Sequence, residues 1–240
     1  TTILVSCGGQ NEIKMGSYAY DAEFLKKHGI EYTELVSADG NSKVMVIPAW
    51  QGRVMTSSAS GDEGDSFGWI NYRFIDKGEI STQFNPVGGE ERFWLGPEGG
   101  PFSLYFKGGQ EQVYDNWVVP AVLDTEPFKV EAQNESSIRF VKDTRLTNAS
   151  GTTFDINIDR IVSLMDADKV AADFNIQLTN DMKIVAYKSE NKITNMGENA
   201  WTKETGLISV WMLGCFNPTP TTTVFIPYKQ GAEGTIVNDE

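Results

Sequence analysis

The sequence predicts an all-β fold, a large antiparallel β-sandwich with one short helix near the N-terminus. The main observation is a series of short segments in which apolar and polar residues alternate, separated by glycine, asparagine or proline turns. Phe154, Ile156 and Ile158, for example, alternate with aspartate and asparagine. The second observation is size: 240 residues, 40% of them hydrophobic, can bury a sizeable core as one unit. We therefore expect one β-sandwich domain over residues 17–240.

The helix is expected over residues 17–29. Asp21 and Glu23 occupy its first turns and two lysines its last, an order that complements the helix dipole, and Gly29 is a usual stop. His28, the only histidine of the chain, stands at the C-terminal end. A histidine in that position is more often a capping or solvated group than a catalyst.

Strands are expected wherever the period-two pattern recurs between turns. The last apolar stretch, residues 207–216, is apolar enough to be buried on both faces. The expected strands cover residues 31–36, 44–48, 53–58, 102–106, 128–130, 138–140, 154–159, 174–178, 184–187, 207–216 and 224–228.

Composition and motifs exclude several classes of function. The net charge of −13 argues against a nucleic-acid partner, because binding a phosphate backbone requires clustered lysine and arginine. A single histidine nearly excludes a Ser-His-Asp triad or a multi-histidine metal site. The acidic residues 61–65 lack the rest of a calcium-binding loop and suit a solvated surface loop. We expect no cofactor and no metal.

Residues 88–101 are the most unusual stretch of the chain. They hold five glycines, two prolines, three glutamates, one arginine and two aromatic residues in fourteen positions. Neither a helix nor a central strand readily keeps so many glycines and prolines. We expect a shaped loop at a concave site, in which Arg92 and Glu98 offer polar groups and Trp94 an aromatic surface. The alternative is a buried crossover whose aromatic residues only fill the core.

Six tryptophans in a β-sandwich suggest carbohydrate binding. Sugars stack their C–H faces on aromatic rings while their hydroxyls need polar partners. Most tryptophans fill cores, but Trp69 and Trp94 stand next to glycines and polar residues. The expected sugar-binding residues are Arg92, Trp94, Trp69, Asn71, Arg73 and Trp117.

The first residues suggest a lipid anchor. Leu4-Val5-Ser6-Cys7 resembles the lipobox that ends a bacterial lipoprotein signal peptide. On this interpretation residues 1–16 comprise the end of a signal peptide, cleaved before Cys7, and a tether. Lipidation of Cys7 would hold the protein at the cell envelope, in the periplasm or on the outer membrane. The alternative is an ordinary first strand.

Several motifs together resemble the galactose-mutarotase-like supersandwich group, and more closely an uncharacterised family of secreted or lipidated bacterial proteins within it. The similarity extends from about Glu31 to the last residue. It implies a curved antiparallel supersandwich with a sugar-facing surface. Members of this kind are longer than 240 residues, which implies that this chain is truncated at its C-terminus. The motifs are Val46-Ile47-Pro48, Gln51-Gly52-Arg53, residues 88–98, 191–195 and 206–214.

The resemblance does not extend to the catalytic pair of true mutarotases. In those enzymes a histidine protonates the ring oxygen, and a glutamate near the C-terminus takes the proton of the anomeric hydroxyl. The comparable strand here, residues 207–216, has no histidine, and the glutamate would lie beyond Glu240. The leading hypothesis is therefore a carbohydrate-recognising lipoprotein. The alternatives are a sugar epimerase, lyase or hydrolase that uses Glu98 as its catalytic residue, and a structural or protein-binding envelope module.

Overall fold

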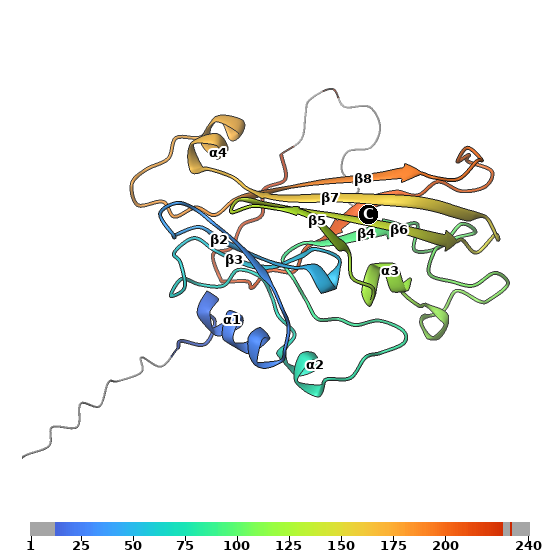
Figure 1. The fold of residues 1–240 in the computed structure, drawn as a ribbon, viewed down its shortest axis with the longest axis horizontal. Coiled ribbons are helices and arrows are strands. Elements are labelled where there is room, and N and C mark those ends of the chain that lie inside the picture. The colour runs from blue at the N-terminus through green and yellow to red at the C-terminus, as the bar shows by residue number, and fades with distance from the viewer. Residues whose placement is uncertain (1–12, 228–230, 232–240) are drawn as a thin grey trace, which may run out of the picture.

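The computed structural model describes residues 13–227 and 231, and these form three antiparallel sheets with few and short helices (Figure 1). The sheet orders are β1-β2-β3, β4-β9 and β5-β6-β7-β8. The expected all-β sandwich with a short N-terminal helix is thus confirmed. The strands are β1 Thr33–Val36, β2 Lys43–Ile47, β3 Arg53–Ser58, β4 Arg92–Gly96, β5 Lys129–Gln133, β6 Ser137–Thr147, β7 Thr153–Leu164, β8 Tyr187–Asn195 and β9 Ser209–Leu213. The helices are α1 Tyr18–Lys27, α2 Tyr72–Lys77, α3 Ala121–Asp124 and α4 Ala167–Phe174, with short 3₁₀ turns at Pro48–Trp50 and Tyr114–Asn116.

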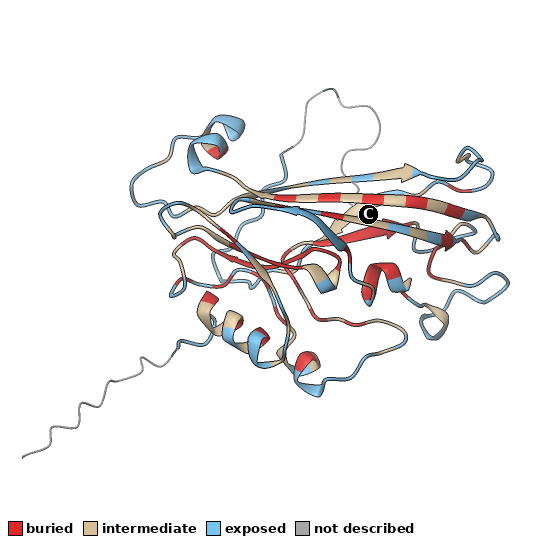
Figure 2. Cartoon of the chain, viewed as in Figure 1, coloured by how far each residue is buried: buried red, intermediate tan, exposed pale blue. Residues whose placement is uncertain are grey.

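The four-stranded sheet forms one layer of the molecule, and β1–β3 cross beneath it, with α1 and α2 on their far side (Figure 1). The long hairpin of β6 and β7 is paired from Ser137–Ser163 to Thr147–Thr153. Burial alternates along β7, as Figure 2 shows by the red and tan bands of that strand. One face of this sheet therefore packs on the core and the other meets solvent.

Two apolar clusters hold the layers together. The larger one fills the space between β4 and the β5–β8 sheet, and includes Phe93, Phe140 and Ile158. The smaller one joins α1 and α2 to β2 and β3, through residues such as Leu25 and Met55. The loop of residues 97–120, which precedes α3, packs against the larger cluster through Leu104, Tyr105 and Val119, and it carries the candidate site described below.

The sequence correctly predicted the first helix and its ends. The side chain of Ser17 accepts a hydrogen bond from the backbone N–H of Tyr20, and His28 is the C-terminal cap. The ring of His28 lies 2.8 Å from the carbonyl of Phe24 through Nδ1 and 2.9 Å from Asp76 through Nε2. The histidine thus links the end of α1 to α2, a capping role as expected.

Three expected strands are absent from the described residues, and a fourth, 184–187, contributes only Tyr187, the first residue of β8. Residues 102–106 follow a turn in which Ser103 N–H bonds to Gly100, so their backbone leaves the ladder geometry. Phe174 is the last residue of α4, and residues 175–178 that follow it are irregular. The prediction was wrong here because a short apolar run cannot by itself distinguish helix from strand. Residues 224–227 are exposed and form no strand, while Tyr228 lies outside the described residues. Strand β9 is only half-buried, not buried on both faces as expected.

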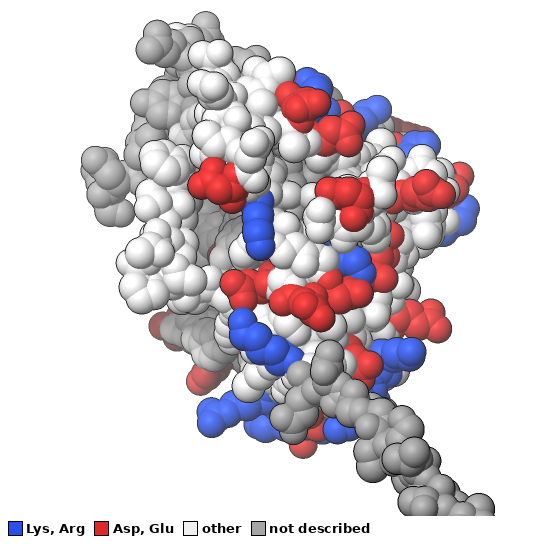
Figure 3. All heavy atoms as spheres, turned by 90° about the vertical axis from the view of Figure 1, so that its left-hand side faces the viewer, with Lys and Arg blue, Asp and Glu red and all other residues white. Residues whose placement is uncertain are grey.

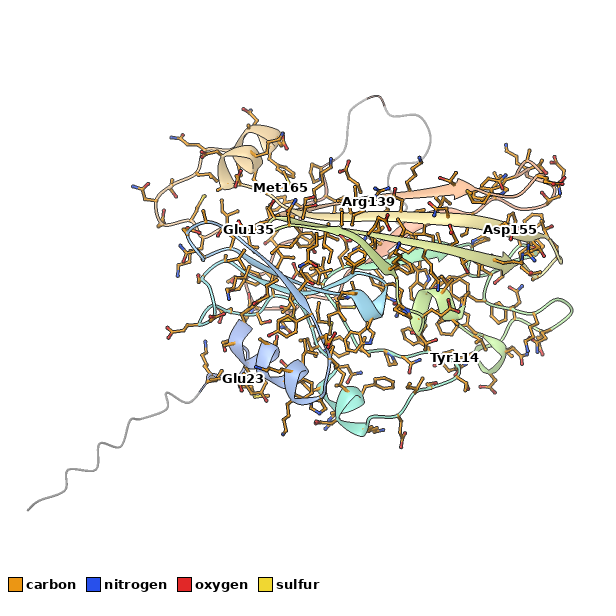
Figure 4. The ribbon with its side chains drawn as sticks, viewed as in Figure 1. Glu23, Tyr114, Glu135, Arg139, Asp155 and Met165 are labelled. Atoms are coloured by element: carbon orange, nitrogen blue, oxygen red, sulfur yellow. The ribbon has the colours of Figure 1, made fainter. Side chains whose placement is uncertain are left out.

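The outer face of the four-stranded sheet carries ion pairs between β6 and β7. Arg139 bonds to Asp159 and Arg145 to Asp155, each through two guanidinium nitrogens (Figure 4 labels one partner of each pair). Another face of the molecule, shown in Figure 3, likewise carries acidic side chains interspersed with basic ones. None of the described helices is long and apolar enough to cross a membrane.

Candidate functional site

The stretch expected to be a loop contains a fully buried strand. Residues 92–96 form β4, and all five of them are buried beside β9. The expectation failed because the glycines flank the strand and do not interrupt it. Gly88 and Gly89 adopt φ angles of +94° and +117°, and a Cβ on Gly88 would stand 2.2 Å from the carbonyl oxygen of Trp69. The glycines therefore serve close backbone packing at the entry to β4.

Arg92 is part of a buried ion pair and is not free to bind a ligand. Its Nη2 donates to the carboxylate of Asp124 at 3.0 Å and to the carbonyl of Leu123 at 2.7 Å. The guanidinium carbon lies in the corner formed by two aromatic rings in edge-to-face contact, 4.1 Å from the centroid of Trp94 and 5.0 Å from that of Phe84. Burial lowers the pKa of Arg92 to about 10, and the charge of Asp124 opposes this shift. Arg92 thus anchors α3 to β4.

Trp94 is also sealed, with 2% of its surface exposed. Its indole N–H donates to the carboxylate of Glu98 at 2.8 Å. Its ring begins a row of parallel aromatic rings that runs outward through Tyr105 and Trp117 to Tyr114, with successive centroids 5.7, 5.7 and 6.1 Å apart. Tyr114, at the outer end of the row, lies near α3 in Figure 4 and is 70% exposed. Both faces of Trp117 are covered by tyrosines, so neither Trp94 nor Trp117 can stack on a sugar.

A cavity of about 830 Å³ lies beside this aromatic row; we call it the loop cavity. Its walls come from residues 80–82, from residues 104–120 of the loop before α3, from α3 itself and the residue after it, and from the β6–β7 turn. Tyr105 and Asp124 belong to its lining, so the cavity touches both the aromatic row and the Arg92 ion pair. The lining residues are Ile80, Ser81, Thr82, Leu104, Tyr105, Phe106, Lys107, Gly108, Gln110, Asp115, Asn116, Val118, Val119, Pro120, Ala121, Asp124, Thr125, Leu146, Thr147 and Asn148.

The lining combines apolar walls with polar groups that the fold does not use. Phe106 is half-buried and Val118 is 42% exposed, so both present apolar surface. Lys107 and Asp115 are exposed, and their charged groups have no hydrogen-bond partner among the described residues. The hydroxyl of Tyr105, in contrast, donates to the carbonyl of Leu95 at 2.6 Å and only supports the wall. The cavity can therefore contact an apolar face and several hydroxyls of one ligand at once.

The remaining residues expected at the site lie elsewhere. Trp69 is 41% exposed beside Gly88, and the side chain of Asn71 caps α2 through the N–H of Phe74. Arg73 is exposed on α2, and none of these three lines the loop cavity. Glu98 is exposed, holds the indole of Trp94 and also stays outside the cavity lining. Cys7 lies outside the described residues.

Sequence reasoning missed the residues that actually line the cavity. Lys107, Asp115 and Asn116 belong to a glycine-containing, polar and aromatic segment that resembles an ordinary loop. The interleaving of charged residues with aromatic ones in residues 105–117 was the available signal. Asp124 has no such signal, because only the fold brings it to Arg92. Among the described residues, no group of three or more His, Cys, Asp or Glu side chains could hold a metal ion.

Glu90 is a buried carboxylate next to β4. One of its oxygens accepts a hydrogen bond from the Ser57 hydroxyl at 2.8 Å, and the hydroxyl of Tyr187 lies beside the carboxylate. Burial raises the pKa of Glu90 from 4.5 to about 7, although the bond from Ser57 opposes the shift. The next residue, Glu91, is instead neutralised by Arg160, whose Nη2 lies 2.6 Å from it. Glu90 is therefore the group of this region that titrates near neutral pH.

These features define an all-β protein with a solvent-open cavity of mixed apolar and polar lining beside a buried ion pair. The chain belongs to DUF6786, a family of unknown function whose sequence model matches residues 16–240. Comparison with curated proteins gave no match, and comparison with solved structures gave none either.

We predict that Arg92→Ala destabilises the fold by about 3–5 kcal/mol, because it leaves the carboxylate of Asp124 buried without its cation. The matched control is Arg139→Ala, which removes an exposed ion pair and costs at most about 1 kcal/mol. Urea denaturation followed by tryptophan fluorescence measures both. Equal losses for the two variants would contradict the assignment of Arg92 as a structural anchor.

We predict that Glu90 makes the free energy of unfolding fall between pH 4.5 and about 7. Its folded-state pKa lies above the unfolded value, so its protonated form stabilises the fold at low pH and this stability is lost as pH rises. Glu90→Gln keeps the acceptor for Ser57 and cannot ionise. Relative to this variant, the natural protein loses about 3 kcal/mol between pH 4.5 and pH 8 in urea titrations. A constant difference across that pH range would contradict the prediction.

Proposed function

We propose that the loop cavity binds a carbohydrate and that the protein is a carbohydrate-recognising lipoprotein of the cell envelope with a mutarotase-like fold. The observation that supports this most directly is the composition of the cavity. It combines the apolar surface of Phe106 and Val118 with the unused polar groups of Lys107 and Asp115, and its volume of about 830 Å³ suits a mono- or oligosaccharide.

The recognition residues in this proposal differ from those that the sequence suggested. Phe106 takes the stacking role expected of Trp69 and Trp94, because its ring borders the cavity and is not covered on both sides by the aromatic row. The charged groups of Lys107 and Asp115 and the amide of Asn116 bond to sugar hydroxyls. Arg92 and Trp94 do not contact the sugar in this proposal. Arg92 holds α3 in place through Asp124, and Trp94 supports the ring of Tyr105 in the cavity wall.

The proposal also concerns where the protein acts. The lipobox-like residues 4–7 support attachment through a lipidated Cys7, with carbohydrate recognition at the surface of the envelope. The resemblance to mutarotase-like proteins supports a sugar as ligand, while the absence of a histidine in residues 207–216 favours recognition over epimerisation.

Binding to the loop cavity is tested by calorimetry with a panel of mono- and oligosaccharides. We expect Phe106→Ala and Asp115→Ala each to weaken the affinity for a bound sugar roughly tenfold, because each removes one class of contact. The matched controls are Phe174→Ala and Asp168→Ala, which are exposed on or near the ends of α4, and these leave affinity unchanged. Binding that survives both cavity substitutions, or no binding to any sugar of the panel, would overturn the proposal.

The anchor is tested by expressing the full-length protein with its signal peptide in a bacterial host. We expect the natural protein in the detergent-soluble membrane fraction with a mass increase at its mature N-terminus. Cys7→Ser removes the acceptor thiol, so this variant is expected in the soluble fraction with no lipid mass, whereas Cys215→Ser behaves like the natural protein. Membrane association of the Cys7→Ser variant would contradict lipidation at this residue.

A further inference from the structure

A second cavity, of about 480 Å³, adjoins the loop cavity; we call it the Trp50 cavity. The two share Ile80, Asp124 and Thr125 in their walls, so they meet at this point of the surface. Ile80 is 79% exposed, which is unusual for a large apolar side chain and places apolar surface at the junction. A ligand that passes over Ile80 reaches both cavities.

The lining of the Trp50 cavity differs from that of its neighbour. Much of it is apolar and aromatic, with Trp50 and Phe74 half-buried and Ile75 and Val87 buried. Such a lining suits a flat apolar group better than a hydroxylated ring. The lining residues are His28, Ile30, Ala49, Trp50, Phe74, Ile75, Asp76, Gly78, Glu79, Ile80, Asn85, Val87, Asp124, Thr125 and Pro127.

The charges of the lining narrow the choice of ligand further. Asp76 and Glu79 are acidic and exposed, and Asp76 lies 2.9 Å from Nε2 of His28, which also lines the cavity; no lysine or arginine lines it. The carboxylate of Asp124 is already occupied, since it accepts from Arg92 and from the backbone and side chain of Asn85. An anionic group would therefore face acidic residues, Glu79 above all, without a lysine or arginine to compensate, whereas a neutral aromatic ring would carry no charge against them.

We infer that the Trp50 cavity is a second subsite that binds a neutral aromatic aglycone of a glycoside whose sugar occupies the loop cavity. The inference rests on the proposed carbohydrate function and adds a ligand class to it, a glycoside carrying a neutral aromatic substituent. The shared wall at Ile80 and Thr125 is where the glycosidic bond crosses between the cavities. Trp50 and Phe74 contact the aromatic ring, and Asp76 and Glu79 discriminate against an acidic one.

The test compares methyl, phenyl and 4-carboxyphenyl β-glycosides of glucose, galactose and N-acetylglucosamine, together with phenol alone, by calorimetry. Burying a phenyl ring in the Trp50 cavity should tighten binding about tenfold relative to the methyl glycoside of the same sugar. The 4-carboxyphenyl glycoside should gain much less. Equal affinities for the methyl and phenyl glycosides would overturn the inference while leaving the carbohydrate function intact.

A variant that fills the Trp50 cavity separates the two subsites. Ala49 is exposed at the rim, so Ala49→Trp occupies the cavity without opening the core. This variant is expected to lose the phenyl preference and to bind methyl glycosides as before. Ala172→Trp, a change to an exposed alanine on α4, is the control and keeps the preference. Retention of the phenyl preference in Ala49→Trp would overturn the inference.

The remaining outcomes distinguish the two proposals. If no methyl glycoside binds but phenol binds the natural protein and not Ala49→Trp, the Trp50 cavity is an aromatic site and the carbohydrate function fails. If neither methyl glycosides nor phenol nor phenyl glycosides bind, both proposals fail.

Discussion

The buried ion pair between Arg92 and Asp124 is the contact on which the two cavities depend. Arg92 comes from β4, in the interior, and Asp124 ends α3, which is only four residues long. A helix of one turn has little stability of its own, so its position is fixed by this pair and by the bond from Arg92 to the carbonyl of Leu123. Because Asp124 lines both cavities, the ion pair also fixes the wall between them.

The surroundings of β4 are unusually rich in buried charge. Each guanidinium nitrogen of Arg160 donates a hydrogen bond: Nε to the carbonyl of Gly52, Nη1 to Asn191 and Nη2 to Glu91. Arg53, in contrast, is fully buried with no carboxylate within ion-pair distance among the described residues. It donates to the carbonyl of Gly88 and more weakly to Gln51. Burial and the nearby charge of Arg92 lower its pKa, so the core holds a cation at a cost that the surrounding packing must offset.

The row of aromatic rings stabilises the loop before α3, whereas the sequence suggested that two of its members, Trp94 and Trp117, bind a sugar. Trp94, Tyr105 and Trp117 stack from the core outward, and Tyr105 bonds to the backbone of β4 through its hydroxyl. Loop 104–119 has no strand or α-helix of its own, so this stacking gives it a defined path. The loop then carries Lys107 and Asp115 to the rim of the cavity, where the fold leaves both side chains exposed.

The sequence by itself determined the all-β class, the helix over residues 17–29 with His28 at its C-terminal end, and the presence, though not the length, of the strands that pair as β6 and β7. These follow from local rules, because capping and the alternation of apolar and polar residues act over a few neighbouring positions. Only the tertiary structure decided that residues 88–101 contain a buried strand and not a ligand-binding loop. Arg92 faces the core because it pairs with Asp124, which lies 32 residues further along the chain. Trp94 faces the core because it packs against rings from outside β4, such as that of Phe84. The cavities likewise form between segments that are far apart in the sequence and contact each other only in the folded chain. Composition and local sequence patterns do not predict such contacts.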